Sequence, residues 1–535
     1  MKRIKIEMVR MNVKKGEAEF EKEIDLTESY FFKCFEIFRE KKIENDELIE
    51  GIIKVVLSEE NGLNELKDGI TYKGEKYIEI NTTTAGMKLE ETNELNEEFK
   101  VESIFINEEK YGDFIKEFEQ SLSGGIISEI EKERREVCIN KMFTSKKALG
   151  MTGAEYVAGM PKICFVDEFE YVVKNNRYSY IDENNNIKTG KIKMPFVLND
   201  GGGLMTPKYS IKIKEALGKS YDIEFVIFRL YHGLAGKGVL VTFDFATYMK
   251  QEYKKDTKTF KKIKDKYYLK DYFGNWRDID NIDCIINKSQ AKYLGEWKDK
   301  IQTGSRWEET LYPIYKDSKY NDINKGIYIS KVNKDPKELK GKIRLNYQVL
   351  QNLNISAQEL IDIAKETVEE FKNVIKMDDI NYVKLALGDW VTDIDKSATI
   401  TNKLNLIIDR VGKETLDWKY IREELKKHLR KRLNQLSGGK IAVNGEICVG
   451  ALCPITYCNY LISGNRGNNG LQKGQFYQGG NIGKRLSYRN PIAYYAEITK
   501  INLVENELLI GYSPEILFVN GFDDFLFIKS GARLQ

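Results

Sequence analysis

Strand-forming residues are concentrated in two separate parts of this chain, and a segment with helical periodicity lies between them. Residues 146–300 contain β-branched and aromatic runs bounded by glycine and polar turns, such as "IEFVIFRL" and "GVLVTFDF". Similar strands return after Gly439. Because 535 residues are too many for one hydrophobic core, the two parts are expected to form separate β-rich domains.

The segment between them follows the 3.6-residue period of helices. One helix is expected to begin at Ser356, with Glu359 three residues later in the pattern of a capping box. A second is expected to open at Asp417 and to end in a basic turn. We therefore expect a mixed α/β part of unknown role at 1–145, a β part at 146–300, a helical connector at 301–436 and a further β part at 437–535.

The composition indicates a reducing, aqueous compartment. Seven cysteines, an odd number spread along the chain, do not form a disulfide framework, so the cytoplasm is the expected location. The sequence has no run of about 18 apolar residues, the length of a membrane span. With only two histidines, histidine-based metal sites and protease triads are disfavoured. The net charge of +3 is too small to indicate partners, which must be inferred from local clusters.

Two glycine-rich loops could bring the backbone close to phosphate. The stretch "DGGGLMTPKYS" begins at Asp200 and includes Gly202 and Lys208. The stretch "GLAGKGVLVTFD" carries Lys237 on a glycine-flanked turn before a strand. It is not a P-loop, because its spacing is wrong and Gly238 follows the lysine. A plain β-turn and a solvated lysine are the alternatives.

Two further clusters could contact a nucleic-acid backbone. In "CIINKSQAKYLGEW", Lys288 and Lys292 flank a hydroxyl and the amide of Gln290, donors that suit phosphate oxygens. The run "KKHLRKR" places Lys426 and Arg430 one helical turn apart on the same face. A solvated turn and a solvated helix end, respectively, explain these clusters equally simply.

Metal-binding patterns are weak. Three cysteines at five-residue intervals in "CVGALCPITYC" lack the CxxC pairs of zinc sites and are expected in the core. Clustered aspartates such as Asp278, Asp280 and Asp283 could bind a metal in an unrelated β-barrel enzyme. Exposed turns are the simpler interpretation of these aspartates.

Taken in order, the segments resemble one family, the cellular RNA-dependent RNA polymerases of RNA silencing together with their single-chain bacteriophage relatives. "DGGGLMTPKYS" is similar to the family's "DGxGxIS", and "INKSQAKY" to its "RPSQxKF". "EFVIFRLYHGLAGKGVLVTFD" resembles "FQIRxGGxKGxxxxD", and "RLNYQVLQNLNIS" resembles "LNRQxIxLL". "GEICVGALCPI" stands where the family has a strand entering its second barrel. The stretch containing "YRNP" resembles "RNPxxxPGDI", and "DDFLFIKSGARL" resembles "DxIVFxxxGxRP".

The resemblance implies an α+β fold with two double-psi β-barrels, the first complete and the second incomplete. It places Lys237 and Lys292 near the phosphates of an incoming nucleoside triphosphate and Arg489 near the ribose or primer end. These three are the expected catalytic cations. The remaining candidates for binding substrate or nucleic acid are Asp200, Gly202, Lys208, Lys288, Gln290, Asn490, Lys426 and Arg430.

The sequence departs from the family in one respect. The family's second barrel carries a DxDGD loop that holds Mg²⁺, and no Asp-Gly-Asp occurs in these 535 residues. We therefore expect a portion or subunit of a split RNA polymerase, inactive alone, whose Mg²⁺-binding aspartates come from a second polypeptide. Expected ligands are a nucleic-acid template, DNA or RNA, and nucleoside triphosphates, without a membrane. The alternative is a non-catalytic nucleic-acid-binding protein derived from a polymerase.

Overall fold

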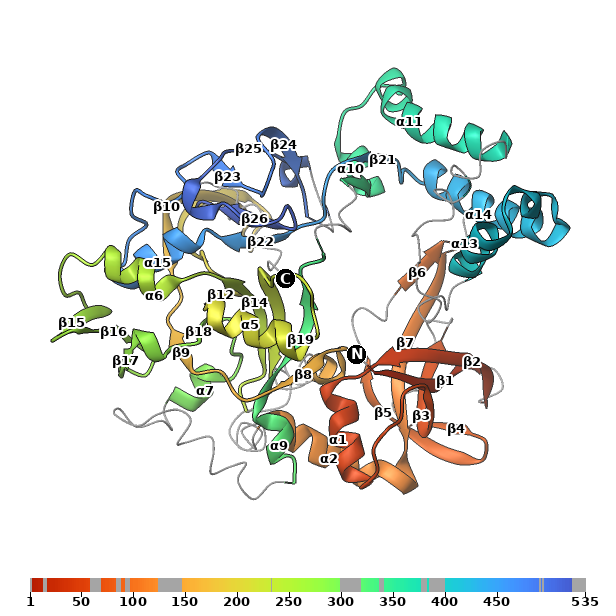
Figure 1. Cartoon of the computed structure of the whole chain (residues 1–535), viewed down its shortest axis with the longest axis horizontal. Coiled ribbons are helices and arrows are strands. Elements are labelled where there is room, and N and C mark those ends of the chain that lie inside the picture. Colours follow the sequence, from red (N-terminus) through yellow and green to blue (C-terminus); the bar gives the residue numbers. More distant parts are fainter. Residues whose placement is uncertain are drawn as a thin grey trace.

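The structure is a computed structural model. It describes residues 2–12, 17–57, 69–82, 88–91, 97–123, 147–231, 233–298, 319–335, 341–376, 383, 400–489, 492 and 495–521. Figure 1 shows an N-terminal sheet with its helices, a body built on two further sheets, and a group of helices that lies apart from both.

The N-terminal part is a seven-stranded sheet covered by two helices. The strand order is β2-β1-β3-β7-β5-β4, and β6 pairs with β7. Phenylalanines of α1 and α2, such as Phe31 and Phe114, pack edge to face in its core. The elements are β1 (Arg3–Asn12), β2 (Glu17–Thr27), α1 (Tyr30–Phe38), β3 (Glu47–Leu57), β4 (Ile70–Tyr72), β5 (Glu75–Thr82), β6 (Lys88–Glu91), β7 (Glu97–Asn107) and α2 (Glu108–Ser123).

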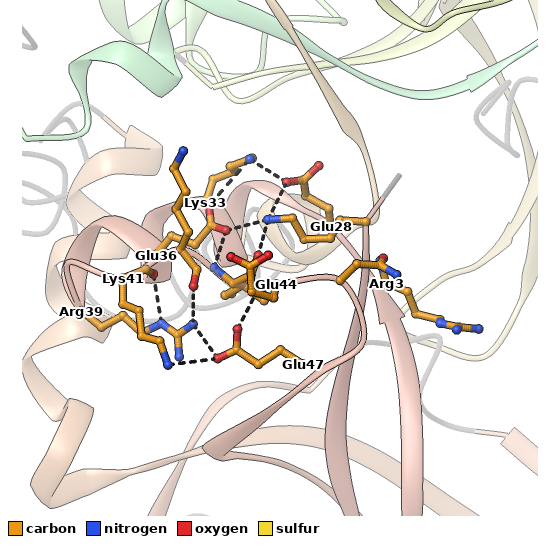
Figure 2. A network of polar contacts seen from close by, with 12 residues as sticks. Arg3, Glu28, Lys33, Glu36, Arg39, Lys41, Glu44 and Glu47 are labelled. Carbon is orange, nitrogen blue, oxygen red and sulfur yellow. Dashed lines mark hydrogen bonds and ion pairs between the residues drawn. The ribbon is translucent and has the colours of Figure 1, made fainter.

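A network of ion pairs fixes the connection between α1 and β3 (Figure 2). The Glu36 carboxylate accepts hydrogen bonds from the Lys2 ammonium at 2.8 Å and from the Ile43 backbone N–H at 2.9 Å. Arg39 near the end of α1 pairs with Glu47 at the start of β3 at 3.1 Å. Because these charged side chains pair with one another, a structural role is favoured for this surface.

The first sheet of the body has seven strands in the order β8-β19-β13-β14-β12-β18-β9, and it curls. Its strands are β8 (Glu155–Ala158), β9 (Ile163–Val166), β12 (Gly202–Met205), β13 (Phe225–Leu230), β14 (Gly236–Thr242), β18 (Cys284–Asn287) and β19 (Gly326–Val332). β10 (Glu170–Ile181) and β11 (Ile187–Val197) form a separate antiparallel hairpin. Because β19 pairs with β13 and β8, the sheet continues past the boundary expected at residue 300.

The second sheet has five strands in the order β22-β26-β23-β25-β24. They are β22 (Val449–Leu452), β23 (Gln475–Tyr477), β24 (Gly483–Ser487), β25 (Thr499–Leu503) and β26 (Ile516–Val519). Side chains of both sheets, including Val239 and Val241 of the first and Phe476 and Phe518 of the second, share one hydrophobic core. The two sheets therefore form one packed body.

Each sheet contains the same local unit. β12 leads through Thr206 into α5 (Pro207–Ala216), and β22 leads through Cys453 into α15 (Pro454–Ser463). Proline at the first helical position has no N–H to satisfy and its φ already suits a helix. In each unit the short strand also pairs in parallel with a later strand, β14 or β26.

Helices fill the expected connector region. They are α10 (Tyr347–Asn352), α11 (Ala357–Lys376), α13 (Ile400–Val411) and α14 (Lys419–Ser437). The capping box is confirmed, since Glu359 accepts from the Ser356 N–H at 2.9 Å and Ser356 Oγ accepts from the Glu359 N–H at 3.3 Å. The prediction that α14 opens at Asp417 is wrong. Asp417 ends a 3₁₀ turn and binds Arg422 at 2.6 Å instead of capping the helix.

Candidate functional site

Three loops of the first sheet, each singled out from the sequence, lie together. The Gly201 N–H donates to Ser289 Oγ at 2.9 Å, which joins the aspartate–glycine loop to the Lys288–Lys292 turn. The Lys237 N–H donates to the Gln290 carbonyl at 2.7 Å, which joins the same turn to the start of β14. The parallel pairing of β12 with β14 and the antiparallel pairing of β12 with β18 bring the loops to one place.

Gln290 locks this arrangement. Its buried side chain donates through Nε2 to the carbonyls of Gly201 at 3.2 Å and Val239 at 3.1 Å, and its Oε1 accepts from the Asn287 N–H at 3.1 Å. Both polar atoms of this amide therefore already form hydrogen bonds within the protein. The expected direct contact of Gln290 with nucleic acid is therefore corrected to a positioning role, in which it holds the backbone that carries Lys237.

The packing of Gln290 explains a glycine in the neighbouring strand. A Cβ at Gly238 would lie 2.4 Å from Gln290 Nε2 and 2.6 Å from the Gly201 carbonyl oxygen. Such distances are not tolerated, because one of the contacting atoms is backbone and the amide is hydrogen-bonded on both sides. The glycine that excluded a P-loop is thus needed for packing.

Asn287 supports the same turn and was not identified from the sequence. Its buried Oδ1 accepts from Ser289 Oγ at 2.7 Å and from the Gln290 N–H at 3.1 Å, while Nδ2 donates to the Gly202 carbonyl at 3.0 Å. The available signal was an asparagine at the end of an apolar strand, two residues before Ser289 and three before Gln290. Gly202 therefore takes part in the site through its carbonyl oxygen.

Lys237 lies half-buried on β14, directly opposite Arg229 on β13. Val239 and Val241 lie on the same side of β14 as Lys237 and belong to the core shared with the second sheet. The side chains of Lys237 and Arg229 therefore project from the face of the first sheet that is turned toward the second. Burial lowers the pKa of the Arg229 guanidinium, whose Nη1 donates to the Phe228 carbonyl at 2.9 Å. Arg229 is a further candidate that sequence reasoning missed.

Arg489, from the segment after β24, approaches the first sheet. Burial lowers the pKa of its guanidinium, and the negative charge of Asp200 acts in the opposite direction. Burial likewise raises the pKa of Glu168, which the Lys288 ammonium opposes and the Asp200 carboxylate reinforces. The Asp200 carboxylate therefore interacts electrostatically with Arg489, which follows β24 of the second sheet, and with Glu168, which follows β9 of the first.

The remaining candidates differ in position. Lys292 donates through Nζ to the Ser289 carbonyl and is half-buried, whereas Lys288 and Lys208 are exposed on either side of the loops. Lys426 and Arg430 are exposed on α14, which lies in the separate helical group of Figure 1. Asn490 lies outside the described residues.

The residues present do not fit a magnesium centre. No group of three or more His, Cys, Asp or Glu side chains occurs among the residues that the structure describes. Asp278 pairs with Lys266 at 3.0 Å, Asp280 with Lys250, and Asp283 accepts from the Lys162 N–H at 2.9 Å, so these aspartates serve as ordinary turn residues.

Two further observations in the described ranges concern the cysteines and the helices. Of the three cysteines expected in the core, Cys453 and Cys458 are buried and Cys448 is partly buried against the same core, and burial raises the pKa of each thiol. No helix in the described ranges is long and apolar enough to cross a membrane.

Comparison with known proteins supports a polymerase-like fold. No family model and no curated protein matches this sequence. Among solved structures, the chain is similar to RNA dependent RNA polymerase QDE-1 from Thielavia terrestris, with a TM-score of 0.54 and 12% sequence identity. The match covers 97% of this chain and 50% of that one, so the chain spans half the length of that structure. The chain therefore has a mixed α+β fold like that of a cellular RNA-dependent RNA polymerase.

Proposed function

We propose that this chain is the N-terminal portion or a subunit of a template-directed RNA polymerase related to bacteriophage enzymes. Its two body sheets would be the two double-psi β-barrels of that family. The observation that supports the proposal best is that the loops carrying Asp200, Lys237 and Lys292 are hydrogen-bonded together, while Arg489 interacts electrostatically with Asp200, in a fold similar to that of an RNA-dependent RNA polymerase.

The site's chemistry suits nucleotidyl transfer. In that reaction a 3′-hydroxyl gives up its proton to water and its oxygen bonds to the α-phosphorus of a nucleoside triphosphate. The bond from that phosphorus to the bridging oxygen breaks, and pyrophosphate leaves. Fixed cations lower the barrier where negative charge develops, provided they need no rearrangement. The hydrogen bonds of Gln290 and Asn287 meet this condition, because they fix the backbone that carries Lys237.

The proposal requires carboxylates from elsewhere. Mg²⁺, when bound, would polarise the phosphates, and this sequence contains no Asp-Gly-Asp to hold it. We propose that a second polypeptide with a DxDGD loop completes the enzyme, and that this chain contributes only the cations. The template is DNA or RNA, since both present the same phosphates to these groups.

Reconstitution tests the proposal. The chain, alone and together with a polypeptide carrying the DxDGD loop, is supplied with Mg²⁺, labelled nucleoside triphosphates and single-stranded DNA or RNA template. We expect labelled RNA only from the pair. If the two polypeptides associate but make no RNA on either template, the proposal is wrong.

The alternative, a non-catalytic nucleic-acid-binding protein, is favoured by the lack of a metal-binding carboxylate group in the described part of the chain. Equilibrium dialysis with labelled ATP separates the two. A polymerase site predicts ATP binding by the chain that weakens in Lys237→Ala. Template binding without any ATP binding would favour the alternative.

A further inference from the structure

A small sheet is inserted between α6 (Phe245–Gln251) and β18. It consists of β15 (Phe260–Ile263), β16 (Lys266–Lys270) and β17 (Trp276–Asp278), antiparallel and in that order. Figure 1 shows it at the edge of the body, beside α6 and remote from the separate helices. None of the contacts described for the candidate site involves these strands.

The inner face of this sheet is fixed to the body. Phe260 and Leu269 are fully buried and belong to the core shared by the two large sheets. Thr257 Oγ1 donates to the Ile462 carbonyl of α15 at 2.6 Å. The small sheet is therefore a rigid extension, and its other face is held in a constant orientation.

The outer face combines aromatic rings with lysines. The register places Lys261 opposite Tyr268 and Lys270 opposite Trp276, and alternation puts all four on the side away from Phe260 and Leu269. The ammonium groups of Lys261 and Lys270 lie 4.0 Å and 5.8 Å from the centroid of the Trp276 ring. Both rings are partly exposed.

The charge of this region is strongly positive. Residues 254–270 contain eight lysines and two aspartates, whereas the whole chain has a net charge of only +3. On the outer face Asp278 pairs with Lys266 at 3.0 Å, so one lysine there is neutralised. Lys261 and Lys270 remain directed at an aromatic ring, with no carboxylate paired to them among the described ion pairs.

We propose that this outer face, made of Lys261, Lys266, Tyr268, Lys270 and Trp276, binds single-stranded nucleic acid. Unpaired bases stack on aromatic side chains, and the backbone is held by neighbouring cations. A base on Trp276 takes the place of the Lys261 ammonium, which then moves to a phosphate. The exchange is favourable because base stacking is stronger than an exposed cation–π contact. A duplex hides its base faces and gains only the phosphate contacts.

This surface would hold the single strand that a template-directed polymerase needs, and in that respect the inference rests on the proposed function. Binding is nevertheless measured on the chain alone, without nucleotide incorporation. A failure of binding at this face and a failure of polymerisation by the reconstituted pair are therefore separate results.

Fluorescence anisotropy with a labelled 20-nucleotide oligo(U) tests the proposal. Trp276→Ala is expected to weaken binding by about 5- to 150-fold, the effect of losing one stacked base, and Trp276→Phe should restore most of it. Trp418→Ala, which removes an exposed tryptophan just before α14, is the matched control and should leave binding unchanged. Retention of the wild-type melting temperature shows that each variant is folded.

A lysine series tests the phosphate contacts. Replacing Lys261, Lys266 and Lys270 by glutamine should reduce the slope of log affinity against log salt concentration by about 1.4. Lys261 and Lys270 each lose a phosphate contact worth about 0.7 on a single strand, whereas Lys266 is already paired with Asp278. The control replaces Lys41, Lys219 and Lys372, exposed lysines elsewhere. Equal losses in both series would overturn the proposal. So would duplex binding as tight as single-strand binding, or binding to phosphatidylserine vesicles without any to oligo(U).

Discussion

Arg229 and Lys237 are direct cross-strand neighbours on β13 and β14, so two cations project from the same face of the first large sheet. Like charges placed opposite each other on a sheet destabilise it. An arrangement that costs stability and gathers positive charge is understandable where an anion binds between the two sheets. We propose the triphosphate of a nucleotide as that anion.

Lys237→Ala in the reconstituted enzyme should lower the rate of nucleotide incorporation by about 100-fold, the typical effect of removing one preorganised charge-stabilising donor. Template affinity should change far less. The measurement is single-turnover incorporation beside template binding, with the exposed Lys219→Ala as control. Equal losses in incorporation and template affinity would assign Lys237 to the nucleic-acid backbone.

Gln290→Met should destabilise the protein by about 3 kcal/mol. The variant keeps the side-chain volume but removes three buried hydrogen bonds, each worth about 1 kcal/mol. The Asn287 N–H loses its acceptor, whereas the Gly201 carbonyl still accepts from the Val239 N–H at 2.8 Å. Urea denaturation measures the change. Gln358→Met on exposed α11 is the control and should be nearly neutral. If the two variants behave alike, the amide does not lock the loops.

Two glycine substitutions should have opposite signs. Gly238→Ala introduces a Cβ 2.4 Å from Gln290 Nε2 and should destabilise the protein by about 1–3 kcal/mol. Gly112→Ala, inside α2 with its nearest contact at 3.8 Å, should stabilise it by about 0.5–1 kcal/mol. Thermal unfolding measures both. A neutral Gly238→Ala would contradict the close approach of the loops.

Glu224→Gln should stabilise the protein at neutral pH. Burial, reinforced by Glu515, raises the pKa of Glu224, whose carboxylate accepts from the Ser513 N–H at 2.7 Å. A carboxyl group with a raised folded-state pKa stabilises the fold at low pH, and this contribution is lost as pH rises through that pKa. Glutamine keeps an acceptor for Ser513 without the buried charge.

Melting temperatures between pH 4 and pH 8 check this prediction. The variant should melt a few degrees higher at pH 8, and the difference should vanish toward pH 4. Glu505→Gln, at an exposed position, should show no such dependence. A gain that is constant across the pH range would rule out titration of Glu224 as its cause.

Local features of the fold were predictable from the sequence. The strands β13 and β14 and the capping box of α11 each depend on residues a few positions apart, and each was confirmed. The polymerase-like fold also followed from the order of the motifs. The division at residue 300 did not anticipate β19, because the pairing of β19 with β13 joins residues about a hundred positions apart.

The site was predictable only in part. Glycines and lysines in three loops indicated phosphate chemistry, and the structure brings those loops together. The burial of Gln290 was not predictable, since a Ser-Gln pair between two lysines looks the same whether its amide faces solvent or the backbone. Arg229 was missed because its significance comes from a cross-strand register, which no spacing within one strand reveals.

The core shared by the two body sheets restricts how this protein can move. Separating the sheets would expose side chains such as Val241 and Phe518 to water, so the two sheets should move as one body. The helical group is joined to the body more lightly, for example by the hydrogen bond from the Ile492 N–H to Gln348 Oε1. Under the proposed function, the motion that advances a nucleic acid by one nucleotide is to be sought in the helices, with the sheets as the stationary frame.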